Sequence, residues 1–180
     1  MKTKLRRVMN TYLAKAEVVE LEDIYREYHK NVYNYISFRI NNHHDSEELT
    51  SHVFEKLLLT WHRYDHNKPI EAWLITIAKN SVTDYLRKRR NFAPIEAMMK
   101  LSSKNKAPEE VALLNESNRE LMEGMAKLSQ KDRGLLAMKF ATDLDNQEIA
   151  ELVGMSPNNA AVAIHRALKR LKKIMEVSYE

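Results

Sequence analysis

The chain has 180 residues, which is room for one domain or two small ones and excludes a large multidomain enzyme. With only 3 glycines and 4 prolines, few positions allow a strand to reverse tightly, and this indicates an all-helical protein. The absence of cysteine excludes disulfide scaffolds, thiolate catalysis and cysteine-ligated zinc, and it favours a reducing, cytoplasmic setting.

The formal charge of +4 is mild, so its distribution along the chain is more informative. Residues 21–85 carry seven Lys or Arg against ten Asp or Glu, and an uninterrupted basic run from Arg87 to Arg90 follows. A second basic stripe lies near the C-terminus, at Arg166, Lys169, Arg170, Lys172 and Lys173. Two separate cationic patches indicate two contacts with a polyanion. No apolar run approaches the ~20 residues of a membrane-spanning helix, so we expect no membrane insertion.

Three helices are predicted in the first half of the chain. Apolar residues recur at steps of three and four from about residue 21 to residue 41, which is the period of one helical face. Asp45 and Glu48 form a capping-box-like start for a second helix. After a loop over residues 64–68, Pro69 can begin a third helix that continues into the basic run. We therefore predict a helical bundle over residues 21–91, preceded by an extension, 1–20, without assigned function.

The periodicity fails after residue 91, and the polar segment that follows predicts a flexible linker over residues 92–117. A second helical domain is expected over residues 118–177. Within it, Ser129 and Asp132 can open a helix that contains Gly134, although glycine there costs up to about 1 kcal/mol relative to alanine. The predicted architecture is two small all-α domains joined by a flexible linker.

The strongest motif lies in the second domain. Asp145 and Glu148 cap a short helix, Gly154 allows a tight turn, and Ser156 with Pro157 starts another helix. This pattern predicts a helix-turn-helix, whose second helix enters the DNA major groove by its N-terminal half. A plain helical hairpin needs the same turn and cap, but the basic stripe that follows favours DNA binding.

Three segments carry a resemblance to a known family. The segment NQEIAELVGMSPNNAAVAIHRALKRLKK resembles the promoter-binding C-terminal domain of bacterial sigma factors, particularly of the extracytoplasmic-function (ECF) class. DSEELTSHVFEKLL is similar to the polymerase-binding helix of that family, and IEAWLITIAKNSVTDYLRKRR to its minus-ten-recognition helix. The resemblance implies a dissociable, non-enzymatic subunit that binds core RNA polymerase, directs it to promoters and promotes DNA melting, with no cofactor.

The resemblance also implies site residues for the melted minus-ten element. They are Lys56, Thr60, Tyr64, Asp65, His66, Asn67, Lys68, Asn80, Arg87, Arg89 and Arg90. Tyr64, in a loop, is the best candidate for stacking on an unpaired base, whereas Trp61, Trp73 and Tyr85 lie on apolar stripes and favour core packing. The amide of Asn80 can pair with a base edge, or it can form a hydrogen bond inside the bundle.

For the duplex minus-thirty-five element, the groove-facing positions of the family fall on Asn158, Asn159, Ala161, Val162, His165 and Arg166, with Lys169 and Arg170 as phosphate contacts or solvated charges. Ala161 and Ala163 stand where the family often has basic residues, so we expect this domain to bind weakly alone. Polymerase binding falls on Asp45, Glu47, Glu48, Leu49 and Phe54, although Phe54 can instead belong to the core. By analogy, an anti-sigma factor is a further expected partner.

Two alternatives to a sigma factor are a metal-binding protein and a stand-alone DNA-binding regulator. Glu48 with His52, and His62 with His66, have the four-residue spacing of metal-ligand pairs, but His66 falls in the predicted loop, so no metal site is predicted. A stand-alone helix-turn-helix regulator that binds duplex DNA without polymerase is the more serious alternative. It requires a dimerisation helix and sufficient affinity of the free protein for DNA.

Overall fold

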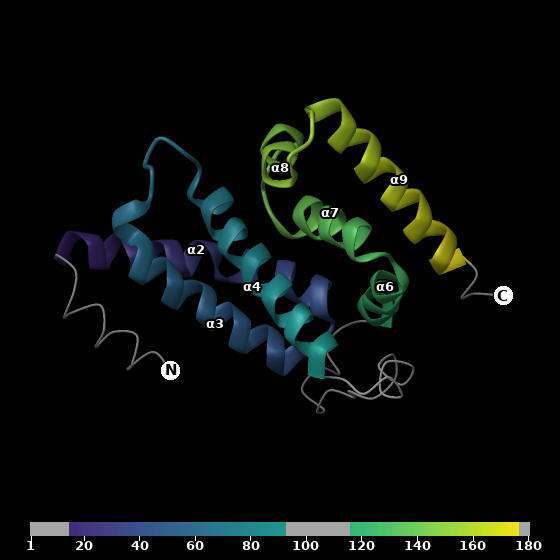
Figure 1. Ribbon diagram of the computed structural model, residues 1–180, viewed down its shortest axis with the longest axis horizontal. Helices are drawn as coiled ribbons and strands as arrows, with labels where there is room; N and C mark the ends of the chain where they lie inside the picture. The colour runs from purple at the N-terminus through teal and green to yellow at the C-terminus, as the bar shows by residue number, and fades with distance from the viewer. Residues whose placement is uncertain (1–14, 93–115, 177–180) are drawn as a thin grey trace.

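The computed structural model describes residues 15–92 and 116–176, with side chains at 20–89 and 119–176, and every regular element in these ranges is a helix. The first group comprises α2 (Lys15–Ile40), α3 (His43–Thr60), the short 3-10 helix η1 (Trp61–Arg63) and α4 (Ile70–Phe92). The second group comprises α6 (Glu116–Lys127), α7 (Gln130–Ala141), α8 (Asn146–Val153) and α9 (Pro157–Glu176). Figure 1 shows the two groups side by side, which confirms the predicted pair of all-α domains.

The three long helices of the first domain pack on one another as a bundle. Their apolar stripes supply fully buried side chains from each helix, namely Val32, Tyr35, Ile36, Val53, Leu57, Leu74, Ile75 and Val82. The apolar face that the periodicity predicts on each helix is therefore the face buried in the bundle. Burial of apolar side chains is the main favourable term in folding. The linker predicted over residues 92–117 lies almost wholly outside the described residues.

The start of α3 differs from the prediction. Asn42, not Asp45, is the N-cap, and its side-chain oxygen accepts a hydrogen bond from the Asp45 N–H at 3.0 Å. Asn41 turns the chain just before the cap with a φ of 50°, a conformation that asparagine tolerates better than most residues. Asp45 consequently lies in the first turn of the helix, where its carboxylate accepts a hydrogen bond from the hydroxyl of Tyr85.

The second domain is capped as predicted. The Ser129 hydroxyl accepts from the Asp132 N–H at 3.1 Å, and Asp145 and Glu148 form a complete capping box at the start of α8. Gly154 ends α8 with a φ of 68°, in the left-handed region that glycine occupies without the penalty of a Cβ atom. Three residues later α9 begins at Pro157, so helix, turn and helix are confirmed.

The two domains also pack directly against each other, which the sequence did not predict. Helix α2 packs against α7, and α4 touches α8. The buried apolar residues of both domains form one continuous cluster. Gly134 faces the Arg39 side chain of α2, since a Cβ atom there would stand 3.2 Å from a guanidinium nitrogen of Arg39. The glycine that weakens α7 locally therefore leaves room for this buried guanidinium.

Candidate DNA-binding and polymerase-binding surfaces

The loop between η1 and α4 is organised by its own side chains. The ring of Tyr64 stacks on Trp61 with centroids 5.1 Å apart, and its hydroxyl donates to the Lys68 carbonyl at 2.5 Å. The Asp65 carboxylate accepts from the backbone and side-chain N–H groups of Asn67 at 3.1 and 3.0 Å, and these bonds lower the pKa of Asp65. Asp65 to Lys68 remain exposed, so the loop presents polar groups from a fixed backbone.

An aromatic cluster supports this loop. Trp61 is 4% exposed, and the rings of Tyr64 and His66 lie against it. Trp73, half-buried on α4, lies with its ring 6.0 Å from that of Tyr64. Trp61 is therefore a core residue, whereas Tyr64 keeps a partly exposed face.

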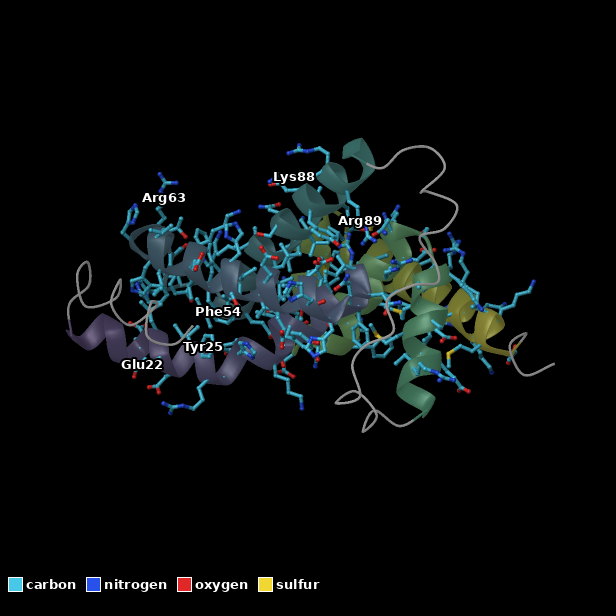
Figure 2. The ribbon with its side chains drawn as sticks, turned by 90° about the horizontal axis from the view of Figure 1, so that it is seen from below. Glu22, Tyr25, Phe54, Arg63, Lys88 and Arg89 are labelled. Atoms are coloured by element: carbon cyan, nitrogen blue, oxygen red, sulfur yellow. The ribbon has the colours of Figure 1, made fainter. Side chains whose placement is uncertain are left out.

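Asn80 lies on the exposed face of α4, which excludes the alternative of a hydrogen bond inside the bundle. Lys56 and Thr60 are half-buried near the end of α3, where the Thr60 hydroxyl donates to the Lys56 carbonyl at 2.7 Å. At the other end of α4, Arg87 is exposed and Lys88 projects away from the ribbon (Figure 2). The side chain of Arg90 lies outside the described residues.

A short hydrogen-bond chain joins the basic run to the start of α3. Arg89 donates to the hydroxyl of Tyr85 at 3.0 Å, and that hydroxyl donates to the Asp45 carboxylate at 2.5 Å. Burial and the neighbouring Asp45 raise the pKa of Tyr85, so the hydroxyl keeps its proton. Tyr85 was predicted to pack in the core, and this contact was not predicted. The signal was the four-residue spacing from Tyr85 to Arg89, which places both on one helical face.

The residues expected to bind polymerase do not share one surface. Glu47 and Glu48 are exposed, and Asp45 and Leu49 are half-buried, all near the start of α3. Phe54 is 2% exposed and packs edge-on against Tyr25 with ring centroids 4.8 Å apart (Figure 2). Phe54 therefore has the core position that the sequence left open, because a helical stripe does not show which neighbour covers it.

The second candidate surface lies on α9, the second helix of the helix-turn-helix. Helix α9 buries Ala160, Ile164, Ala167 and Leu171 against its own domain. On the remaining face, the predicted groove-facing and phosphate-facing side chains are all exposed except the half-buried Ala161: Asn158, Asn159, Val162, His165, Arg166, Lys169 and Arg170. Arg170 forms an ion pair with Asp132 of α7 at 2.9 Å. The structure thus brings these residues onto one open helical face.

Metal ligands do not gather in the described part of the chain, where no group of three or more His, Asp or Glu side chains could hold an ion. Nor does any described helix combine the length and apolar character needed to cross a membrane.

Two family models match this chain in the order of its two domains. The model of sigma-70 region 2 matches residues 24–92, and that of sigma-70 region 4 matches residues 118–171. These matches define a sigma factor of the sigma-70 class. The ECF RNA polymerase sigma factor ShbA of Streptomyces griseus is 30% identical over 165 residues, covering 86% of each chain. SigM of Bacillus subtilis, another ECF sigma factor, is 27% identical over 154 residues, 86% of this chain and 94% of SigM. The chain belongs to the ECF family of RNA polymerase sigma factors.

Solved structures share the fold. The sigma factor RpoE of Bartonella quintana, crystallised with the anti-sigma factor NepR, superposes with a TM-score of 0.70 at 17% identity, over 88% of this chain and 98% of RpoE. CnrH, solved with the cytosolic domain of CnrY, gives a TM-score of 0.62 at 18% identity, over 96% and 95% of the two chains. Both likenesses concern the arrangement of the helices.

Proposed function

We propose that this ECF sigma factor guides core RNA polymerase by reading two promoter elements, one with each domain. The observation that carries the proposal is the open face of α9, the second helix of a capped helix-turn-helix, in a chain whose other domain matches sigma-70 region 2. Family membership favours this function over a stand-alone regulator. The chain would act as an initiation factor in the cytoplasm, and the polymerase would supply the catalysis.

The first domain would hold the melted minus-ten strand. Tyr64 offers a partly exposed ring on a loop whose backbone is fixed by hydrogen bonds, and base stacking needs such a prepared aromatic face. Asn80 offers both a donor and an acceptor from the exposed face of α4. Arg87 and Arg89 would neutralise nearby phosphates, because a melted strand keeps its full backbone charge.

The second domain would read the duplex minus-thirty-five element with the first turns of α9. Asn158 and Asn159 can form paired hydrogen bonds with adenine, Val162 can contact a thymine methyl group, and Arg166 can bind guanine or phosphate. Arg170 is held by Asp132, so it would contribute less than Lys169 to phosphate binding.

The exposed acidic start of α3, at Glu47 and Glu48, would contact core polymerase together with Asp45 and Leu49. An anti-sigma factor is a further proposed partner, because the sigma factor RpoE, which shares this fold, was solved in complex with the anti-sigma factor NepR.

Transcription from a promoter library tests the proposal directly. The purified chain is mixed with core polymerase and the library, and start sites are mapped against a reaction with core polymerase alone. New start sites that share two upstream elements are expected. A start-site profile identical to that of core polymerase alone would exclude the proposed function.

Arg166→Ala tests the assignment of the second domain. Loss of a bidentate contact to guanine costs about 1–3 kcal/mol, so promoters should lose discrimination at one upstream position while binding to core polymerase is unchanged. Lys131→Ala, an exposed lysine of α7, is the matched control. Equal loss of core binding and promoter recognition in Arg166→Ala would show that the domain is misassigned.

A further inference from the structure

The interface between the two domains contains polar contacts that neither DNA reading nor polymerase binding uses. The buried carboxylate of Glu71, in the first turn of α4, accepts from the backbone N–H of Asp143 at 3.1 Å. Asn31 of α2 donates to Glu71 at 2.8 Å and to the Asp143 carboxylate at 3.3 Å. Asp143 lies between α7 and α8, so these three residues join the first domain to the second.

Two cations extend the same interface by binding helix C-termini across it. Lys79 of α4 donates to the Leu152 carbonyl in the last turn of α8 at 2.5 Å. Arg133 of α7 donates to the Arg39 carbonyl in the last turn of α2 at 3.2 Å. Carbonyls at a helix C-terminus lack partners within the helix and carry partial negative charge, so both contacts stabilise the closed arrangement.

Two buried arginines at the same interface destabilise the closed arrangement. Arg39 and Arg133 are 8% and 7% exposed, and each has a buried Nε without a hydrogen-bond partner within the described part of the chain. Burial and the neighbouring Arg39 lower the pKa of Arg133. Buried like charges without a carboxylate partner are costly, so they oppose the closed arrangement, which the polar contacts and the shared apolar cluster hold together.

The closed arrangement cannot place both reading surfaces on their elements. Because Lys79 contacts Leu152, and Asn158 follows Leu152 by six residues, the Cα atoms of Lys79 and Asn158 are at most about 35 Å apart. Elements centred about 10 and 35 base pairs before a start site are separated by roughly 85 Å of B-form DNA. The domains must therefore move apart before Asn80 and Asn158 can bind their elements together.

We propose that the contacts of Glu71 and Asn31 with Asp143 form an autoinhibitory latch, which closes the free chain and must open when the chain binds polymerase and promoter. The inhibitory effect of the latch rests on the proposed function, whereas the closed state can be tested in the free chain.

Spin labels report the latch without polymerase. The natural chain lacks cysteine, so Glu22→Cys and Lys131→Cys, both at exposed positions and in different domains, place one label on each. The wild-type background should give one narrow distance distribution. Asn31→Asp, which adds a carboxylate facing Glu71 and Asp143, and Glu71→Ala should raise the population of longer distances about tenfold, the order expected for a hydrogen bond to a charged group.

Glu55→Gln, at an exposed carboxylate on α3, is the matched control and should keep the narrow distribution. Circular dichroism confirms that each variant keeps its helices, and Asn31→Asp serves if Glu71→Ala fails to fold. A wild-type distribution as broad as that of Asn31→Asp would overturn the latch.

A cross-link tests the autoinhibitory consequence. Cysteines at Asn31 and Asp143, joined by a short bis-maleimide, should reduce transcription at least tenfold from a promoter found by start-site mapping. The control is Asp23→Cys with Arg26→Cys, an exposed pair within α2, joined by the same reagent. Full activity of the chain cross-linked at residues 31 and 143 would overturn the autoinhibition. If the chain without a cross-link directs no transcription, the proposed function fails, while the spin-label distances still decide whether the chain is closed.

Discussion

The two surfaces proposed to bind DNA are built in different ways. In the first domain, the loop after η1 is fixed by stacking and by hydrogen bonds within it, and Arg89 is held by Tyr85. On α9, the reading side chains from Asn158 to Arg166 extend from one exposed helical face. A single strand has no fixed shape of its own, so the protein must supply a prepared surface, whereas duplex DNA presents a regular groove to a helix. The comparison indicates that preorganisation is greatest where the nucleic acid is least ordered.

The largest expected effect tests whether the two regions are energetically separate. Leu74 of α4 and Leu136 of α7 are both fully buried, so replacing either by alanine should cost about 2–5 kcal/mol. Because one apolar cluster runs through both domains, each variant should lower the midpoint of a single unfolding transition in urea. Two separate transitions, each lowered by only one of the variants, would show that the domains unfold independently.

Tyr64→Ala tests the prepared loop. Loss of a stacking partner should weaken binding of the polymerase complex to single-stranded minus-ten DNA by about 1–3 kcal/mol, measured by fluorescence anisotropy. Tyr64→Phe, which keeps the ring on Trp61 and removes only the hydroxyl bond to Lys68, should retain most of the binding. Wild-type affinity in Tyr64→Ala would mean that the ring does not stack on a base.

Tyr85→Phe tests whether the hydrogen bond from Arg89 to Tyr85 matters for DNA binding by the first domain. Removing the hydroxyl breaks the contacts with Arg89 and Asp45, and a hydrogen bond of this kind contributes about 0.5–1.5 kcal/mol. We expect weaker minus-ten binding with unchanged recognition of the upstream element, measured on separate DNA fragments with the polymerase complex. An equal loss on both fragments would show that Tyr85 serves the stability of the whole chain.

The smallest expected effect is a pH dependence of the free energy of unfolding, caused by Glu71 at the contact between the two domains. Burial raises the pKa of Glu71 above its ordinary 4.5; hydrogen bonds from Asn31 and Asp143 oppose this, and the charges of Asp143 and Glu148 add to it. The folded chain then binds the proton more tightly than the unfolded chain, so this contribution to stability is complete below pH 4.5 and is lost as the pH rises through the raised pKa.

Glu71→Gln should therefore flatten the decline in the free energy of unfolding above pH 4.5, measured by urea titration at several pH values. Glu55→Gln, at an exposed carboxylate of α3, should follow the wild-type curve. A Glu71→Gln curve parallel to that of the wild type would contradict the assignment.

Local sequence was sufficient to predict the helices, whereas the assignment of DNA-contacting residues stays a prediction. The helix-turn-helix depends on contacts within a few residues, namely the capping box of Asp145 with Glu148 and the left-handed turn at Gly154, so its pattern is visible in the chain. The N-cap of α3 was assigned three residues too late, because Asn42 and Asp45 are both good capping residues and only the backbone turn at Asn41 separates them.

Contacts between elements distant in sequence could not be predicted. Phe54 of α3 packs against Tyr25 of α2. Arg133 donates to the carbonyl of Arg39, and Glu71 accepts from the backbone N–H of Asp143. Periodicity shows which face of a helix leaves water but not which partner covers it, and the room that Gly134 leaves for Arg39 of α2 likewise depends on packing. Sequence patterns are sufficient to predict two helical domains with two basic stretches, whereas the packing of α2 on α7, which closes the domains on each other, depends on contacts between distant segments.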